Sequence, residues 1–227
     1  MGLLIIGLAG VLGTTAMIGV MSWIHHLKLA NADMVRAIGT LFTKSNDLSR
    51  FYGLVVNYSF GIFFAFVYAF LMGLSPVLTP GSAVIITLLT GLVHGLMVGL
   101  MLIVAVGEFH PMKKFRNVGV PVALAHVVGH VVYGLTIGST FALTWARVYP
   151  VLVDMASGRI FGDIIGFAVI WFPLFGIPMI FVGYMIYAFA APDRYTETEK
   201  APRSIVRKKS GSTRGKVKSK SSLKRAA

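Results

Sequence analysis

Four stretches without a charged side chain constrain this sequence more than any other feature. Counting histidine as neutral, they cover residues 1–27, 51–107, 117–146 and 164–192. A helix needs roughly 20 apolar residues to cross the hydrocarbon core of a bilayer, so each stretch can hold a span and the second can hold two. Only 13% of the 227 residues are charged, against about 25% in soluble domains. The sequence therefore predicts an all-α, multi-pass membrane protein.

We expect five transmembrane helices in one domain over residues 1–192. The segment "SPVLTPGS", residues 75–82, divides the second stretch because its prolines and glycine favour a turn. The first stretch has no early Lys or Arg and a long apolar run, which favours an uncleaved span over a secretory signal peptide. The expected spans are residues 3–24, 47–74, 83–106, 118–145 and 161–190, the last bent at Pro173 or Pro178.

The basic residues indicate the orientation. Apart from Arg147 and Arg159, every Lys and Arg falls in the loops at 25–50 and 107–117 or after the last span. Cytoplasmic loops carry an excess of Lys and Arg. We therefore expect the N-terminus outside the cell membrane and the C-terminus in the cytoplasm.

Two segments outside the spans have their own character. Residues 32–43 have apolar residues on one helical face and predict a short helix on the cytoplasmic membrane surface, with a plain linker as the alternative. Residues 193–227 are strongly basic and too polar to bury a core, so they predict a disordered tail.

The tail is expected to attract anionic lipid headgroups. Nucleic acid or ribosome contact is disfavoured because the basic run after residue 200 has no aromatic side chain to stack on bases. The basic residues expected to contact headgroups are Arg207, Lys208, Lys209, Lys216, Lys218 and Lys220.

Glycines recur at four-residue spacing on the third and fourth expected spans. Small residues let membrane helices approach closely, and the two spans are joined by a short loop, so we expect them to pack as antiparallel neighbours. This packing explains the glycines without a ligand. They are Gly91, Gly95 and Gly99 on one span and Gly134 and Gly138 on the other.

Three histidines fall inside expected spans. His126 and His130 in "ALAHVVGHVVYG" are one turn apart and share a helical face. Counting about 1.5 Å per residue from the ends of the spans places His94 and His130 at comparable depth near the middle of the membrane. Residues of this kind usually face the interior of a helix bundle, so the three imidazoles are expected to converge.

Several interpretations of His94, His126 and His130 stay open. Neutral imidazoles can simply bond helices together. Three histidines can instead hold a transition metal with an open position, or His94 with one of the others can clamp a haem iron. A proton relay is the remaining possibility. A second, cytoplasmic-end group comprises His25, His26, Glu108 and His110, although Glu108 can equally pair with Lys113 or Arg116.

Recognisable catalytic patterns do not occur in the sequence. There is no cysteine, and we find no phosphate-binding glycine loop, serine elbow, HExxH or acidic pair. We expect a non-enzymatic accessory or structural subunit, in a larger membrane complex or as a homo-oligomer. The alternative is a redox or metal-handling protein that uses the three histidines. A small transporter or proton path comes third, because the spans are few and carry no mid-membrane carboxylate.

The segment "HVVYGLTIG", His130 to Gly138, resembles the fourth span of small multi-pass bacterial and archaeal membrane proteins without an assigned activity. The similarity covers about the first four spans, including the glycine-rich first one. It implies a membrane bundle and brings no activity with it.

Overall fold

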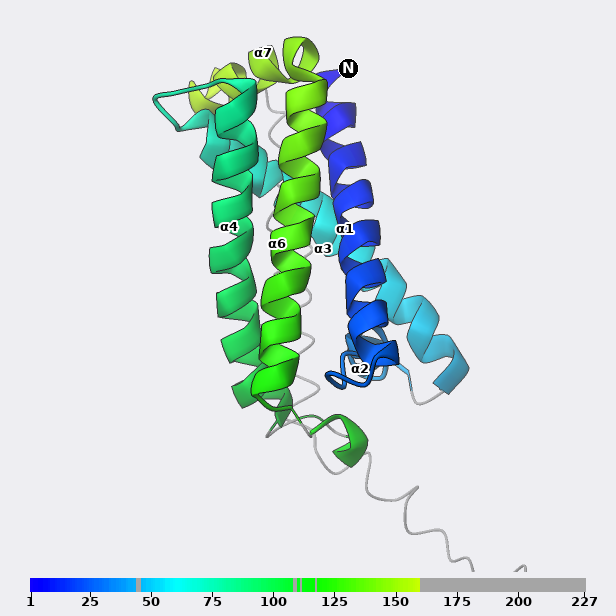
Figure 1. Ribbon diagram of the computed structural model, residues 1–227. Helices are drawn as coiled ribbons and strands as arrows, with labels where there is room; N and C mark the ends of the chain where they lie inside the picture. The colour runs from blue at the N-terminus through cyan, green and yellow to red at the C-terminus, as the bar shows by residue number, and fades with distance from the viewer. Residues whose placement is uncertain (44–45, 108–109, 111, 117, 160–227) are drawn as a thin grey trace, which may run out of the picture. The chain divides into compact units, whose positions relative to one another are not determined.

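The computed structural model consists of helices throughout its described part (Figure 1). Contacts group residues 1–192 into one unit and residues 193–227 into another. The described residues all belong to the first unit, and they hold no strand. They are residues 1–43, 46–107, 110, 112–116 and 118–159.

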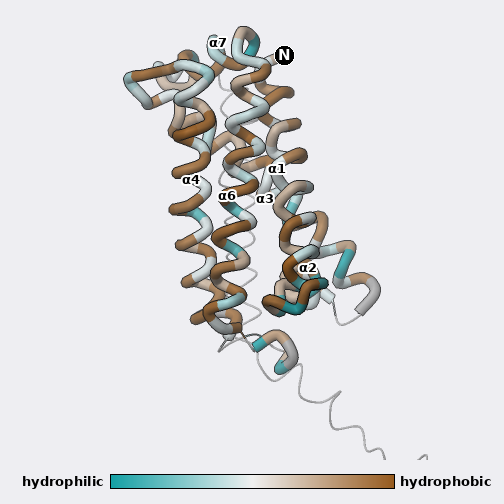
Figure 2. Tube along the Cα trace, viewed as in Figure 1, coloured by the Kyte–Doolittle hydropathy of each residue, from teal (hydrophilic) through white to brown (hydrophobic). Residues whose placement is uncertain are grey.

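Four helices in the described part are long and apolar enough to cross a membrane. They are α1 (Gly2–His26), α3 (Asn46–Gly73), α4 (Pro80–Met101) and α6 (Val120–Leu143). Hydrophobic residues recur along the whole length of α1, α4 and α6 (Figure 2). The prediction of an all-helical, multi-pass membrane protein is therefore confirmed, with each of these spans within a few residues of its expected bounds.

The turn between α3 and α4 ends in a well-defined helix start. Thr79 accepts a hydrogen bond from the backbone N–H of Ser82, and the Ser82 side chain accepts one from the backbone N–H of Thr79. Pro80 occupies the first turn, where no backbone donor is needed. At its other end α4 continues as a short π-helix, η1 (Leu102–Val106).

The fourth long helix ends two residues before the expected bound of 145, and a further helix that the sequence did not indicate follows it. In the structure α6 ends at Leu143, and a separate helix, α7 (Trp145–Ala156), begins after Thr144. Val148, Leu152 and Met155 are buried on one side of α7. Because that amphipathic face packs across the ends of α1 and α3, the chain turns at Thr144.

The predicted surface helix is shorter than expected. Helix α2 covers Met34–Gly39. The Asp33 side chain does not cap this helix but forms an ion pair with Arg36 at 3.7 Å. A Cβ on Gly39 would collide with the backbone of Ser49, and one on Gly53 with the backbone of Val35. Helix α2 is therefore packed tightly against the start of α3.

The two ends of the bundle are formed by different elements. The start of α1, the turn before α4 and helix α7 lie at one end (Figure 1). Helix α2 and η2 (Lys113–Phe115) lie at the other. The described basic residues at the α2 end are Lys28, Arg36, Arg50, Lys113, Lys114 and Arg116, whereas Arg147 and Arg159 are at the α7 end.

Two apolar clusters fill the interior. The one nearer α7 joins α1, α3, α6 and α7 and includes Ile6, Tyr68 and Phe141. The one nearer α2 includes Met21 and Phe115. The expected fifth span at 161–190, its bends at Pro173 and Pro178, and the basic tail lie outside the described residues.

Candidate functional site

Glycines set the distance between α4 and α6. A Cβ on Gly95 would lie 2.8 Å from Cα of Val127 and 3.2 Å from the carbonyl oxygen of His126, and one on Gly99 would lie 3.0 Å from the Ala123 carbonyl oxygen. Any larger residue would therefore push the backbones apart.

The other glycines of this seam behave in the same way. A Cβ on Gly91 would overlap the carbonyl group of His130, and a Cβ on Gly134 or Gly138 would overlap Thr87. The five glycines singled out in the sequence thus lie where α4 and α6 touch, and this close approach brings the histidines of the two helices together.

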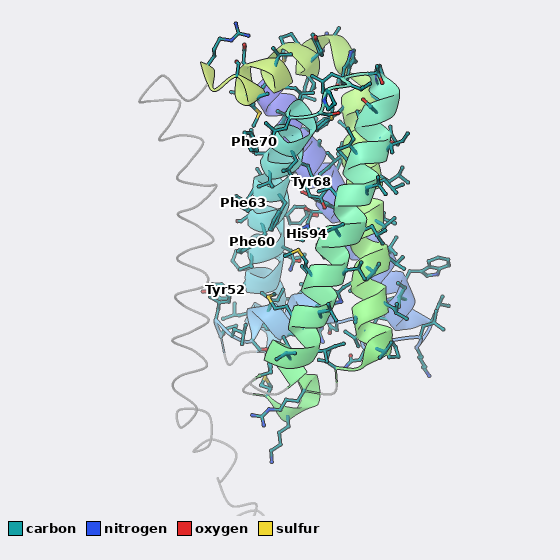
Figure 3. All side chains as sticks on the ribbon, turned by 90° about the vertical axis from the view of Figure 1, so that its left-hand side faces the viewer. Tyr52, Phe60, Phe63, Tyr68, Phe70 and His94 are labelled. Carbon is teal, nitrogen blue, oxygen red and sulfur yellow. The ribbon has the colours of Figure 1, made fainter. Side chains whose placement is uncertain are left out.

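A cluster of two aromatic and three imidazole side chains crosses the bundle at this seam. We call Phe64, Tyr68, His94, His126 and His130 the histidine–tyrosine cluster. Figure 3 shows Tyr68 and His94 pointing toward each other between α3 and α4. The Tyr68 hydroxyl lies 3.2 Å from Nδ1 of His94. The Phe64 and His94 ring centroids are 4.1 Å apart.

The imidazoles of α4 and α6 touch directly. The His94 and His130 ring centroids are 4.5 Å apart with an angle of 68° between the rings. His126 and His130 are further apart, at 6.3 Å. The expected convergence thus holds best for His94 and His130, and His126 lies one turn away from their contact.

Backbone hydrogen bonds fix how two of the rings are protonated. Nδ1 of His126 lies 2.9 Å from the Val122 carbonyl oxygen, and Nδ1 of His130 lies 2.8 Å from that of His126. A carbonyl oxygen only accepts, so each Nδ1 carries a proton and donates it. In the neutral form each Nε2 then has a free lone pair. Neither Nε2 has a hydrogen-bond partner among the described residues.

Tyr133 of α6 contacts the cluster through the ring of Tyr68. Its hydroxyl donates to the carbonyl oxygen of Gly61 on α3, and its ring meets that of Tyr68 edge to face at 5.4 Å. It also fits against Gly13 of α1, where a Cβ would lie 2.8 Å from the Tyr133 ring. One side chain thus contacts two further spans.

The arrangement limits which cofactors can bind. A haem held by two histidines lies between their rings, but the His94 and His130 rings are in contact and leave no room for a macrocycle. Over the described ranges, no group of three or more His, Asp or Glu side chains is placed to hold a metal ion. The three histidines therefore do not make a three-ligand site in this arrangement.

The second predicted group is divided in the structure. His110 is 1% exposed, and its Nε2 donates to the Ala37 carbonyl oxygen at 3.1 Å, which joins the loop after η1 to α2. Its Nδ1 accepts from the backbone N–H of Met112 at 3.1 Å. Arg116 donates to the His110 carbonyl oxygen at 2.6 Å. His110 is thus part of the packing of α2.

His25 and His26 contact each other at the end of α1, with ring centroids 6.2 Å apart. Within the described part they make no hydrogen bond or ring contact with His110. Nδ1 of His25 is buried there without a hydrogen-bond partner. Glu108 and the tail residues from Arg207 to Lys220 lie outside the described residues.

Sequence reasoning missed Phe64 and Tyr68. Tyr68 is about five residues from the end of α3, whereas His94 is about fourteen from the start of α4, which is a difference of roughly 13 Å along the helices. A count of residues from the helix ends therefore does not predict that Tyr68 and His94 meet.

Comparison with known proteins yields no relative. No protein-family model, no curated protein and no solved structure matches the sequence. Function must therefore be argued from the bundle itself.

Proposed function

We propose that the protein is a non-enzymatic accessory or structural membrane subunit and that the histidine–tyrosine cluster has a structural role. The observation that carries this proposal is the pair of contacts made by His94. Its Nδ1 meets the Tyr68 hydroxyl of α3, and its ring meets His130 of α6. One side chain of α4 thus connects two other spans.

The energetics fit this role. Neutral imidazole costs far less in the membrane than a charge, and polar groups there usually face the bundle interior. Hydrogen bonds between membrane helices contribute about 0.6 kcal/mol on average and up to about 1.7 kcal/mol. The glycine seam provides the close packing, and the cluster adds directional contacts that select one arrangement of α3, α4 and α6.

The proposal also includes the topology of the chain in the membrane. Residues 161–190 form a fifth span, the N-terminus is outside the cell membrane, and the tail is cytoplasmic and contacts anionic headgroups. The separation of described basic residues between the α2 and α7 ends supports this orientation. A role within a larger complex or a homo-oligomer is part of the subunit proposal.

Unfolding measurements test the structural role. We expect Tyr68→Phe and His94→Ala to lower the free energy of unfolding in detergent by about 0.5 to 2 kcal/mol, without loss of any bound group. Tyr149→Phe is the matched control, because Tyr149 is 42% exposed on α7. Metal analysis and an absorption spectrum of the purified protein complete the test. A stoichiometric metal or a haem band that disappears in His94→Ala would overturn the proposal.

A second candidate function, soft-metal handling, is favoured by one specific observation. His126 and His130 both use Nδ1 for backbone carbonyls and so offer Nε2 lone pairs from one helical face, the arrangement typical of metal-binding histidines. The Met21 sulfur approaches α6 at Gly129, which lies between these two histidines in the sequence. A Cβ added to Gly129 would be 3.2 Å from that sulfur. Thioether and imidazole together suit Cu(I).

Copper titration separates the two candidates. Metal handling predicts that purified protein binds Cu(I) and that His126→Ala abolishes binding while Tyr68→Phe does not. Protein that binds no Cu(I) would exclude it. A proton path through the cluster stays a prediction.

A further inference from the structure

The end of α1 is closed by a backbone turn that favours glycine. The backbone N–H of Leu29 donates to the Ile24 carbonyl oxygen at 3.2 Å. The backbone N–H of Lys28 donates to the His25 carbonyl oxygen at 3.0 Å. These two bonds define the Schellman motif, in which the residue between its last two positions is left-handed and usually glycine. Here that residue is Lys28, with φ of +58°, and over the described ranges no other residue except glycine has a positive φ.

A lysine at this position costs folding free energy. In the left-handed conformation a Cβ crowds the following carbonyl oxygen, whereas glycine has no Cβ. A cation does gain from the negative end of a helix dipole. However, a lysine in place of Leu27, which has ordinary helical dihedral angles, would gain as much without the strain. The dipole therefore does not explain why the basic residue is Lys28, and strained positions of this kind are often functional.

The neighbours of Lys28 in the sequence are large, apolar and exposed. Trp23 is 65% exposed, Leu27 is 52% exposed and Leu29 is 66% exposed. Trp23 and Leu27 are one turn apart and share a face of α1. Tryptophan is enriched where a membrane meets water, and a lysine there lays its methylene groups along apolar surface while its ammonium stays in water. The end of α1 thus has the composition of a membrane interface.

The length of α1 places this end at the headgroups. The first residue of the helix packs against α7, because a Cβ on Gly2 would lie 2.7 Å from the Arg147 carbonyl oxygen. Trp23 is roughly 32 Å further along the helix, and the hydrocarbon core is about 30 Å thick. Figure 1 shows this end of α1 at the same end of the bundle as α2. With α7 at one surface of the membrane, Trp23 and Lys28 reach the other.

The charge of Lys28 is available to an anion. Two ion pairs occur within the described part, between Asp33 and Arg36 and between Asp154 and Arg159, and neither includes Lys28. Lys28 is exposed, at the end of the bundle where most of the described basic residues lie. An exposed ammonium beside interfacial apolar side chains complements the negative charge of an anionic phospholipid.

We infer that the turn at residues 27–29 binds the headgroup of an anionic phospholipid, with Lys28 donating to the phosphate and Trp23 lying at the boundary between headgroup and acyl chains. This site belongs to the helical bundle and is separate from the basic tail. It goes beyond the structural role proposed for the histidine–tyrosine cluster and does not depend on it.

Quenching of Trp23 fluorescence by brominated lipids tests the site. The sequence has three tryptophans, so Trp145→Phe with Trp171→Phe leaves Trp23 alone in the full chain. Brominated phosphatidylglycerol and brominated phosphatidylcholine, each diluted into unlabelled phosphatidylcholine, then report which lipid is preferred at this position.

We expect phosphatidylglycerol to be preferred at Trp23 and the preference to fall about five-fold in Lys28→Gln, the equivalent of ~1 kcal/mol for one basic residue near an anionic surface. Lys113→Gln is the matched control, because Lys113 is also an exposed lysine at the α2 end. It should leave the preference unchanged.

Two further variants keep the test independent of folding. Lys28→Gly removes the charge and introduces the residue that the turn favours, so it should fold as well as the starting chain and show the same fall in preference. Should the two tryptophan replacements impair folding, the difference in quenching between the unaltered chain and Trp23→Phe supplies the same measurement.

Three results would overturn the inference. Equal falls in Lys28→Gln and Lys113→Gln would indicate a general basic surface without a site at this turn. A starting chain without any preference for phosphatidylglycerol, or a preference that Lys28→Gln leaves unchanged, would reject the site directly. The unfolding test of Tyr68→Phe is independent of all three, so failure of the proposed function would be seen separately.

Discussion

Replacing Gly95 by alanine is the sharpest test of how the site is assembled. The new Cβ would lie 2.8 Å from Cα of Val127, 3.0 Å from Cβ of His130 and 3.2 Å from the carbonyl oxygen of His126. Ordinary contact begins at about 3.4 Å. Since two of these three neighbours are backbone atoms of α6, side-chain rotation cannot relieve the overlap. Helices α4 and α6 must therefore separate by about half an ångström or distort locally.

The expected cost follows from overpacking. Adding a methyl group to a well-packed interface costs about 1–3 kcal/mol, and the separation also weakens the contact between His94 and His130. Gly19→Ala is the matched control, because a Cβ on this glycine of α1 has nothing within 4 Å. Alanine is a better helix former than glycine by roughly 0.5–1 kcal/mol, so the control should be neutral or stabilising.

Reversible unfolding of both variants in mixed detergent, followed by circular dichroism, measures the two free energies. We expect Gly95→Ala to be less stable than Gly19→Ala by about 1–3 kcal/mol, the cost of overpacking, because both variants gain the same helix propensity and that gain cancels in the difference. Equal stability of the two variants would refute the argument that backbone contact at the glycine seam holds the site together.

Three other predictions follow from the ends of the chain and of α4. A reporter fused after Ala227 should be cytoplasmic and one in the 75–82 turn should be outside; the reverse result at either position would contradict the five-span topology. Truncation after Lys200 should leave the bundle folded but weaken its binding to anionic liposomes, by up to ~1 kcal/mol per basic residue at low salt, and a loss of folding would show that the tail is structural. Thr79→Ala, which removes the side-chain acceptor at the start of α4, should lower the unfolding free energy by about 1 kcal/mol, and an unchanged value would show that the capping box does not stabilise the helix.

Much of the architecture was readable from the sequence because it depends on local properties. Whether a segment crosses a membrane is decided by the apolar length of that segment, and the four described spans begin and end close to the expected residues. The Pro80 turn is equally local. The spacing of Gly91, Gly95 and Gly99 indicated a close helix contact, since residues four apart share a face. The same rule placed His126 and His130 together.

Other features depend on how the helices are offset along their axes, which no single segment records. The pairing of Tyr68 with His94 arises because α3 and α4 are displaced relative to a simple depth count. His110 meets α2 and not His25, because α2 packs on α3 and carries Ala37 to it. The contact between the His94 and His130 rings has a similar origin, since the glycines between α4 and α6 let the two helices approach until the rings touch.

The sequence by itself determined that this chain is a membrane bundle, where its described spans lie, and which residues share a helical face. Only the tertiary structure decided that α6 stops at Leu143 and α7 turns across the bundle end, because that turn is stabilised by burial of Val148 and Leu152 against other helices. Only it decided which polar groups meet inside the membrane. Hydropathy and helical periodicity are properties of one segment, whereas helix offset and crossing result from packing among all of them.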